Sequence, residues 1–353
     1  ALGVCRRHLF LLYAIKKCVQ KMPRLEVQCV LELGVYQLCF MASVPASAAV
    51  NTSAELVRRI GLGEGSVKLV NGILRKIERE GLPELPAQNV RKISLENSFP
   101  EWLVRRMLDF YGKDVATEIA EESVKRPSQW IRANTQKISA EKLKTELNLS
   151  GRIYANRYLE IVDAPDEVHL GDLLKGEFFA QGFFSVQNPA AYEVVKLLDV
   201  QENSFVWDAC AAPGGKTALI AEMFPTVKIL ASDVSAERSR AMEDLHRRLD
   251  LQNVRVETLD VLASSFDQRF DRILLDVPCS NLGVLSRRPE AKYRLTPDDF
   301  KTLPELQSRI LEKASRALKV GGILVYATCS PDLAETDNVV KKFLEMHSDF
   351  GKC

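Results

Sequence analysis

The chain of 353 residues has no Cys-x-x-Cys pair, no long apolar run, no internal repeat and no low-complexity segment. Its eight cysteines are scattered, which argues against a zinc site or a disulfide framework and favours free thiols in a reducing cytoplasm. The four histidines show no metal-ligand spacing, so no bound metal is expected. No apolar segment reaches the roughly 18 residues of a membrane helix, so no membrane is expected as a partner.

Net charge is also small, at +1, but it is unevenly distributed. Residues 1–130 contain 19 Lys and Arg against 14 Asp and Glu, whereas the remainder contains four more acidic than basic residues. A basic N-terminal part could attract the phosphates of a nucleic acid. Helices with ordinary solvated charges would give the same count, so both interpretations stay open.

Hydrophobic periodicity divides the chain into four regions. Residues 1–85 have apolar side chains at helical spacing, as in Val67, Val70, Ile73 and Ile77, and predict an all-α domain. Residues 86–126 predict a helical linker, and residues 127–184 predict a small α+β module. Residues 185–353 alternate between strands and helices, which predicts an α/β fold with a doubly wound, mainly parallel sheet. Its strands are expected at 204–208, 227–233, 254–259, 270–276 and 322–328.

Aromatic residues gather near the end of the α+β module, at Phe178, Phe179, Phe183 and Phe184. They could stack on bases of a nucleic acid. Packing against the following domain is the interpretation we favour.

A turn rich in small residues follows the first strand of the predicted parallel sheet. Ligands of open α/β sheets bind beyond the carboxyl ends of the strands, so this turn is a candidate cofactor site. Small side chains let a ligand approach the backbone, and the helix N-terminus that follows favours the carboxylate of a methionine moiety. The residues concerned are Cys210, Ala211, Ala212, Pro213, Gly214, Gly215 and Lys216. A phosphate-binding loop is a weaker alternative, because its first glycine would stand at Cys210.

Two aspartates follow the next two strands. Asp233 could accept both hydroxyls of a ribose, as the acidic residue after strand two does in dinucleotide folds. Asp260 follows the third strand, where the amino group of an adenine could be reached. Either aspartate could instead cap a helix.

Two cysteines, Cys279 in Asp-Val-Pro-Cys-Ser and Cys329 in Thr-Cys-Ser, follow the last two predicted strands. A thiolate can add to carbon 6 of a cytosine, which makes carbon 5 nucleophilic, and can later be expelled. Together with the glycine turn, the pair indicates S-adenosylmethionine-dependent methylation of an RNA cytosine through a covalent cysteine adduct. Asp276 is expected to contact the cofactor or to hold the cytosine near ring nitrogen 3.

These motifs, with Ala-Ala-Pro-Gly-Gly-Lys-Thr, resemble the RNA 5-methylcytosine methyltransferases, and most of all their bacterial Sun/Fmu type. Residues 31–38 and Val70–Arg75 are similar to the NusB-like RNA-binding domain of that type. The resemblance implies a Rossmann-like sheet that binds S-adenosylmethionine, RNA-binding roles for the NusB-like domain and the small module, and 16S ribosomal RNA as substrate. It assigns the attack on carbon 6 to Cys329 and assistance in product release to Cys279.

Alternatives remain for both residues and function. DNA 5-methylcytosine enzymes use a single Pro-Cys nucleophile, so Cys279 is the rival nucleophile, although DNA is not an expected partner here. Transfer RNA or another ribosomal RNA could be the substrate. A non-catalytic NusB-like RNA-binding protein is the alternative from a different class, but binding alone requires neither cysteine.

The chain departs from the family pattern in two places. A basic segment with Arg287, Arg288, Lys292 and Arg294 follows Cys279 and is expected to grip RNA phosphates, but Arg-Arg-Pro replaces the family's Arg-Arg-His-Pro. Family members also continue through two further strands beyond the position of Cys353, and this chain begins inside the helical domain. We therefore expect truncation at both ends.

Overall fold

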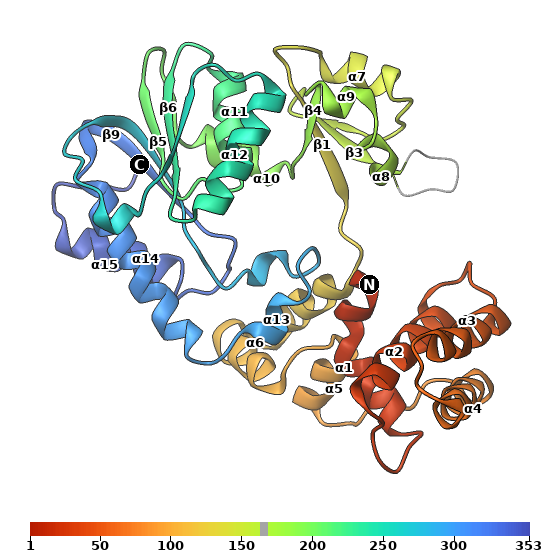
Figure 1. Cartoon of the computed structure of the whole chain (residues 1–353). Helices are drawn as coiled ribbons and strands as arrows, with labels where there is room; N and C mark the ends of the chain where they lie inside the picture. Colours follow the sequence, from red (N-terminus) through yellow and green to blue (C-terminus); the bar gives the residue numbers. More distant parts are fainter. Residues whose placement is uncertain (163–168) are drawn as a thin grey trace. The chain divides into compact units, whose positions relative to one another are not determined.

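The structure is a computed structural model that describes residues 1–162 and 169–353, and it divides into two compact units. Unit 1 comprises residues 1–126 and 281–297. Unit 2 comprises residues 127–280 and 298–353. The chain therefore leaves unit 2 directly after Ser280 and returns to it at Asp298 (Figure 1).

Unit 1 is helical, as its periodicity predicts. Its helices are α1 (Leu2–Lys16), α2 (Leu25–Phe40), α3 (Ala46–Arg59), α4 (Glu64–Glu80), α5 (Asn89–Glu96), α6 (Glu101–Val124) and α13 (Ala291–Arg294), with a 3-10 turn at Leu282–Val284. The apolar stripe of α4 is buried against α2. A side chain at Gly34 would collide with Leu74 and Ser53, so this glycine permits the close packing of α2 on α3 and α4. In the described part of the chain, no helix is both long and apolar enough to cross a bilayer.

The first part of unit 2 is a small antiparallel sheet with short helices. Its elements are β1 (Gln129–Ala133), α7 (Ala140–Glu146), β2 (Ile153–Tyr154), β3 (Tyr158–Ile161), α8 (Leu170–Leu173), α9 (Glu177–Ala180) and β4 (Phe184–Val186), and the strand order is β2-β3-β1-β4. Ser139 caps α7 by accepting the N–H of Lys142. The aromatic group named above packs mainly into this module's own core, rather than against the next domain as we had favoured. Arg248, which belongs to the second part of unit 2, lies over the Phe179 ring, 4.0 Å from the centroid of that ring. This contact connects the aromatic group to the second part of the unit.

The second part of unit 2 is the expected doubly wound parallel sheet, with strand order β7-β6-β5-β8-β9. Its strands are β5 (Phe205–Asp208), β6 (Lys228–Asp233), β7 (Val254–Thr258), β8 (Phe270–Asp276) and β9 (Leu318–Ala327). Its helices are α10 (Ala190–Lys196), α11 (Gly215–Met223), α12 (Ala236–Leu249), α14 (Asp299–Ser315) and α15 (Asp337–Met346), with a 3-10 turn η1 (Val261–Ala263). β8 and β9 are neighbours, so the loops that follow them leave the sheet side by side.

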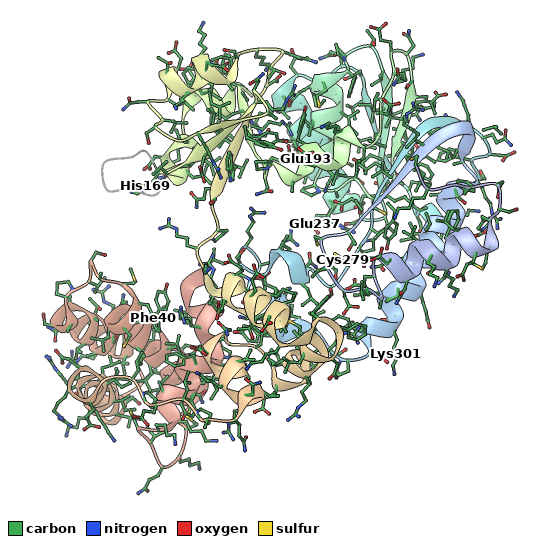
Figure 2. All side chains as sticks on the ribbon, turned by 180° about the vertical axis from the view of Figure 1, so that it is seen from behind. Phe40, His169, Glu193, Glu237, Cys279 and Lys301 are labelled. Atoms are coloured by element: carbon green, nitrogen blue, oxygen red, sulfur yellow. The ribbon has the colours of Figure 1, made fainter. Side chains whose placement is uncertain are left out.

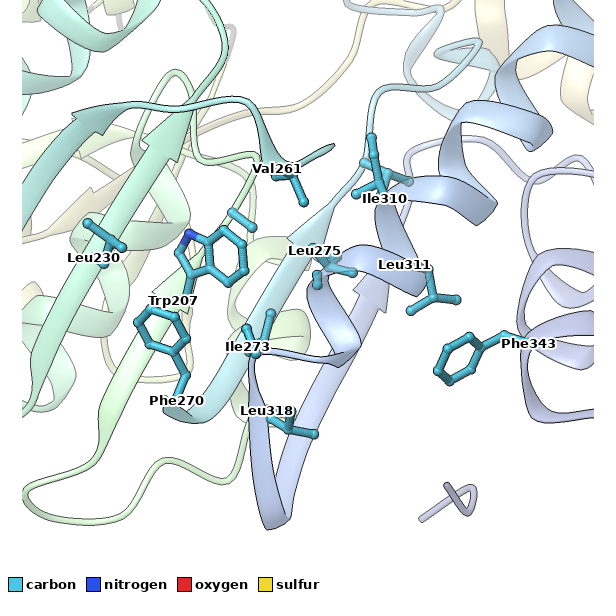
Figure 3. Packing of buried hydrophobic residues seen from close by; sticks show 14 of the residues in the cluster. Trp207, Leu230, Val261, Phe270, Ile273, Leu275, Ile310, Leu311, Leu318 and Phe343 are labelled. Carbon is cyan, nitrogen blue, oxygen red and sulfur yellow. The ribbon is translucent and has the colours of Figure 1, made fainter. Parts of the chain in front are cut away.

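Helices pack on both faces of this sheet, and most side chains of its central strands β5, β6 and β8 are buried. Successive side chains of a strand point to opposite faces. Ile273 and Leu275 of β8 therefore join the cluster with α14 and α15, whereas Leu274 joins the cluster with α10 and α11. Trp207 and Phe270 stack in the first cluster with ring centroids 5.2 Å apart (Figure 3). Each such side chain contributes on the order of 2 kcal/mol through burial, which fixes the strand ends that hold the site.

Candidate active site

The predicted cofactor turn lies between β5 and α11, at the carboxyl end of the sheet. Ala211 donates its N–H to the carbonyl of Ser232, 2.9 Å away, which ties the turn to β6. Gly214 has φ +93°, and a side chain there would collide with Met242 and His246 of α12. The backbone conformation and the close packing both require glycine at this position. Burial raises the pKa of the Cys210 thiol to about 12, so that side chain stays neutral.

Asp208, the last residue of β5, is a buried acid that the sequence reasoning did not single out. Its Oδ2 accepts the hydroxyl of Thr217 at 2.6 Å, while Oδ1 is buried without a hydrogen-bond partner in the described part of the chain. Burial raises the pKa of this carboxyl to about 7. An acid that closes an apolar strand immediately before a glycine turn is the sequence signal that could have identified it.

Cys279 and Cys329 meet beyond the ends of β8 and β9, with their sulfur atoms 2.8 Å apart (Figure 2 labels Cys279). The sequence placed both cysteines after neighbouring strands, and the structure brings them together. The hydrogen bond with Cys279, followed by burial, raises the pKa of Cys329. Two sulfurs this close cannot both ionise without strong repulsion, so the pair holds at most one negative charge.

Lys216 and Asp276 form an ion pair beside the two thiols, and the Lys216 ammonium donates to Oδ2 of Asp276. Lys216 comes from the first turn of α11 and Asp276 from the end of β8, so this pair links the cofactor turn to the Pro-Cys loop. The charge of Lys216 lowers the pKa of Cys329, whereas that of Asp276 raises it. The two predicted residues therefore adjust the same thiol in opposite directions.

Asp233 and Asp260 lie at the ends of neighbouring strands but have different local partners. Oδ1 of Asp233 accepts the N–H of Ser235 and the guanidinium of Arg238, each at 2.9 Å. Asp260 caps η1 by accepting the N–H of Leu262 at 2.9 Å. Asp260 thus has the capping role that we left open, while the expected contacts of both carboxylates with a cofactor stay predictions.

A buried ion pair lies behind the turn and was not visible in the sequence. Arg132 of β1 donates to both carboxylate oxygens of Glu222 on α11, at 2.7 and 3.1 Å. It also donates to the carbonyl of Gly215 at 3.0 Å and to the side chain of Gln187. The small module is therefore anchored to the helix that begins at the cofactor turn. Residues 90 positions apart form this pair, and no local pattern indicates such a partnership.

The basic segment after Cys279 differs from its expected role at one position. Arg287, Arg288 and Arg294 are exposed, but Lys292 is fully buried in unit 1. Its ammonium donates to the carbonyls of Arg6 and Asn97, at 3.2 and 2.9 Å. Lys292 cannot grip a phosphate from this position, so that part of the prediction is wrong. The ammonium also lies over the Phe99 ring, 4.6 Å from its centroid, so carbonyls and an aromatic face enclose it.

Comparisons with known proteins match three stretches of the chain to family models. Residues 195–353 match the family model of the 16S rRNA methyltransferase RsmB/F. Residues 1–79 match the NusB family, and residues 99–158 match the ferredoxin-like domain of RsmF/B-like methyltransferases.

Solved structures and curated relatives extend these matches to nearly the whole chain. The crystal structure of PH0851 has a TM-score of 0.82 and 24% identity over 98% of this chain and 79% of that one, which supports the fold. A methyltransferase homolog protein from Pyrococcus horikoshii has a TM-score of 0.62 and 29% identity over 74% of this chain and 83% of its own.

Among the curated relatives, the probable ribosomal RNA small subunit methyltransferase B of Bacillus subtilis is 35% identical over 99% of this chain and 79% of its own length. Its namesake from Shewanella oneidensis is 36% identical over 90% of this chain and 72% of its own length. With glycine turn, paired thiols and helical N-terminal region in their expected places, the chain belongs to the ribosomal RNA small subunit methyltransferase B family of RNA methyltransferases.

Proposed function

We propose that this protein transfers a methyl group from S-adenosylmethionine to carbon 5 of a cytosine in 16S ribosomal RNA, through a covalent adduct of Cys329 with carbon 6. The observation that carries the proposal is the contact of two thiols, 2.8 Å apart, from neighbouring strand ends. Methyl transfer to an oxygen or to an exocyclic nitrogen would need no thiol. A cytosine ring needs one sulfur to activate carbon 5, and a second group to help the product leave.

The steps at the substrate follow from that chemistry. Cys329 attacks as the thiolate, after its thiol has lost its proton, and its sulfur forms a bond to carbon 6 while the ring electrons move so that carbon 5 becomes nucleophilic. After carbon 5 has received the methyl group, Cys279 assists removal of the carbon 5 proton. The bond between carbon 6 and the Cys329 sulfur then breaks, which restores the aromatic ring and the free sulfur. Asp276 is proposed to hold the cytosine near ring nitrogen 3, a position where its carboxyl could share a proton.

The turn fits S-adenosylmethionine, which when bound supplies the electrophilic methyl group. The buried Oδ1 of Asp208 lacks a partner among the described residues, and the amino group of the cofactor is a donor that would satisfy it. Residues 210–216, Asp233 and Asp260 would hold the remainder of the cofactor. The N-terminus of α11 favours a carboxylate, and Asp233 favours ribose hydroxyls.

RNA is the proposed partner, and the cytoplasm is the proposed location of the reaction. We propose a NusB-like RNA-binding domain in residues 1–85, a helical linker in 86–126, an RNA-binding module in 127–184 and the catalytic domain in 185–353. The exposed Arg287, Arg288 and Arg294, in the segment that follows the Pro-Cys loop in the sequence, would contact RNA phosphates.

The direct test measures transfer of a labelled methyl group from S-adenosylmethionine to 16S ribosomal RNA that lacks the modification. We expect label in a single cytosine, at carbon 5, when the product is mapped at base resolution. Label in transfer RNA alone would support the alternative substrate. No label in any RNA, with RNA binding intact, would instead support the non-catalytic alternative.

The two cysteines are separated by their variants. Cys329→Ala should abolish methyl transfer and form no covalent RNA adduct. Cys279→Ala should permit attack and methylation and then accumulate protein attached to RNA, because the step that it assists comes after bond formation. A denaturing gel with labelled RNA shows the adduct as a slow band. Cys29→Ala, which removes an exposed thiol of α2, is the matched control and should behave as the unmodified protein. An adduct in Cys329→Ala and none in Cys279→Ala would transfer the nucleophilic role to Cys279.

A further inference from the structure

Glu335 is a completely buried carboxylate between β9 and α15, and no ion pair involves it within residues 1–162 and 169–353. Its Oε1 accepts the hydroxyls of Ser280 and Ser330, at 2.5 and 2.6 Å. Its Oε2 accepts the N–H of Ser280 at 2.9 Å and the side-chain amide of Gln307 at 3.0 Å. Burying a carboxylate is costly unless donors surround it, and here four donors do so.

The serines connect this carboxylate to the thiols. Ser280 directly follows Cys279, and Ser330 directly follows Cys329. Both serines donate to the same oxygen atom of Glu335, and their own oxygens lie 2.9 Å apart. Ser280 has one proton, which it shares between Ser330 and the closer Glu335, whereas Ser330 gives its proton to Glu335, so the carboxylate joins the two serines.

Further hydrogen bonds fix Glu335 in turn. Its backbone carbonyl accepts the hydroxyl of Tyr326 on β9 at 2.8 Å, and its N–H donates to the carbonyl of Asp332 at 2.9 Å. Gln307 of α14 also donates to the carbonyl of Pro278 at 2.9 Å, immediately before Cys279. Glu335 is thus attached to the sheet and to α14, while it binds both cysteine loops.

We propose that Glu335 is a positioning residue that sets the distance between Cys279 and Cys329 by binding the serine that follows each of them. Attack and product release require both sulfurs to reach one ring, so a change in that distance affects the reaction without removing either thiol. The consequence for catalysis rests on the proposed function, whereas the effect on thiol spacing does not.

Glu335→Gln is the informative variant, because it keeps the volume of the side chain but replaces one accepting oxygen with a donating amide. With its amide nitrogen at the position of Oε2, the new side chain faces the N–H of Ser280 and the amide of Gln307, which are both donors, and those two hydrogen bonds are lost. With the nitrogen at the position of Oε1, the hydroxyls of Ser280 and Ser330 must turn to accept from it, which changes how the two serines are held. Glu312→Gln is the matched control, since Glu312 is a half-buried acid on α14 that binds Arg316 and His347. Thermal unfolding and calorimetry of S-adenosylmethionine binding establish that each variant is folded.

Thiol spacing is measured first, in the 353-residue chain without RNA. Phenylarsine oxide bridges two thiols that lie close together, and mass spectrometry identifies the bridged pair. We expect phenylarsine oxide to bridge Cys279 and Cys329 in the unmodified protein and in Glu312→Gln. In Glu335→Gln we expect the affinity of these two thiols for phenylarsine oxide to be about ten-fold lower, which corresponds to about 1.4 kcal/mol. Unchanged bridging in a folded Glu335→Gln would overturn the proposal, even if its methyl transfer were slower.

Catalysis is measured second, with unmodified 16S ribosomal RNA. We expect kcat of Glu335→Gln to fall at least ten-fold, while KM for RNA and the affinity for S-adenosylmethionine stay within about two-fold, because neither binding site contains Glu335. Ser280→Ala with Ser330→Ala should reproduce the effect and add little to Glu335→Gln. If the effects of the two serine substitutions and of Glu335→Gln on kcat were fully additive, the proposal would be overturned. If the unmodified protein methylates no RNA, the proposed function fails, and the arsenical measurement still decides the role of Glu335 in thiol spacing.

Discussion

Replacing Arg132 with methionine tests the attachment of the small module to the cofactor turn. The side chains of Arg132 and Glu222 are both 0% exposed and share two hydrogen bonds. Removing one partner of a buried pair leaves the other charge without compensation, which costs about 3–5 kcal/mol. The carbonyl of Gly215 also loses a donor. We therefore expect Arg132→Met to lower the free energy of unfolding of unit 2 by about 4 kcal/mol.

The loss should depend on pH in a definite direction. Burial raises the pKa of Glu222, and Arg132 opposes this rise. Without Arg132 the pKa of Glu222 rises further. A carboxyl with a raised pKa in the folded state binds more protons folded than unfolded, so its contribution to stability declines as the pH rises. The loss of unfolding free energy caused by Arg132→Met should thus be smaller near about pH 5 than near about pH 8.

Hydrogen exchange followed by mass spectrometry measures this loss, because peptides from β1 and α11 report on unit 2 alone. Arg152→Met is the matched control, since Arg152 is 73% exposed and its pair with Glu160 is expected to contribute about 0–1 kcal/mol. Adding Glu222→Leu to Arg132→Met should restore most of the stability, because no buried charge then remains. A loss no larger than that of Arg152→Met, or one that is equal at both pH values, would refute this reasoning.

Three further predictions concern separate features. Asp233→Ala should weaken S-adenosylmethionine binding by on the order of 2 kcal/mol, and an unchanged affinity in calorimetry would remove Asp233 from the site. Burial lowers the pKa of Lys292 to about 7; the folded state then binds fewer protons than the unfolded one, so unit 1 should gain stability as the pH rises through and above about 7. Lys292→Met should remove that gain in chemical unfolding followed at two pH values. Replacing Lys16, Lys17 and Arg91, which line one groove of unit 1, with glutamate should weaken RNA binding and reduce its salt slope by about 2, whereas an unchanged slope would place the RNA elsewhere.

Much of the fold and part of the site followed from the sequence, because local patterns determine them. Period-two and period-3.6 apolar spacing located the strands and helices, and parallel order then placed both cysteines at neighbouring strand ends. The strand predicted at 322–328 begins four residues earlier, at Leu318. A glycine such as Gly321 usually marks a turn, so the predicted strand begins after it. In the structure Gly321 has φ +77° and lies inside β9, at an irregularity in the pairing between β8 and β9. Turn residues inside a strand cannot be distinguished from a strand boundary without the partner strand.

Charged residues were harder to place, because their role depends on partners distant in the sequence. Lys292 lies among exposed arginines and was assigned to RNA with them, yet carbonyls of Arg6 and Asn97 surround it. Arg132 likewise gives no local sign of its pair with Glu222. A buried charge needs an oppositely charged or hydrogen-bonding group within contact distance, and the tertiary fold decides which group that is. Sequence patterns report the side of an element that is apolar, but they do not report which polar side chain will be enclosed.

The two Cys-Ser motifs illustrate how adjacent residues divide a task. Ser280 and Ser330 are 2% and 4% exposed, whereas the cysteines before them are less buried. In each motif the serine therefore points into the protein toward Glu335, and the cysteine is left accessible for a substrate. A serine hydroxyl is small enough to be enclosed and has one proton to donate to a buried carboxylate. The pairing of a reactive residue with an anchoring one explains why both motifs continue with serine, and why a single glutamate can govern the spacing of two thiols that are 50 residues apart in the chain.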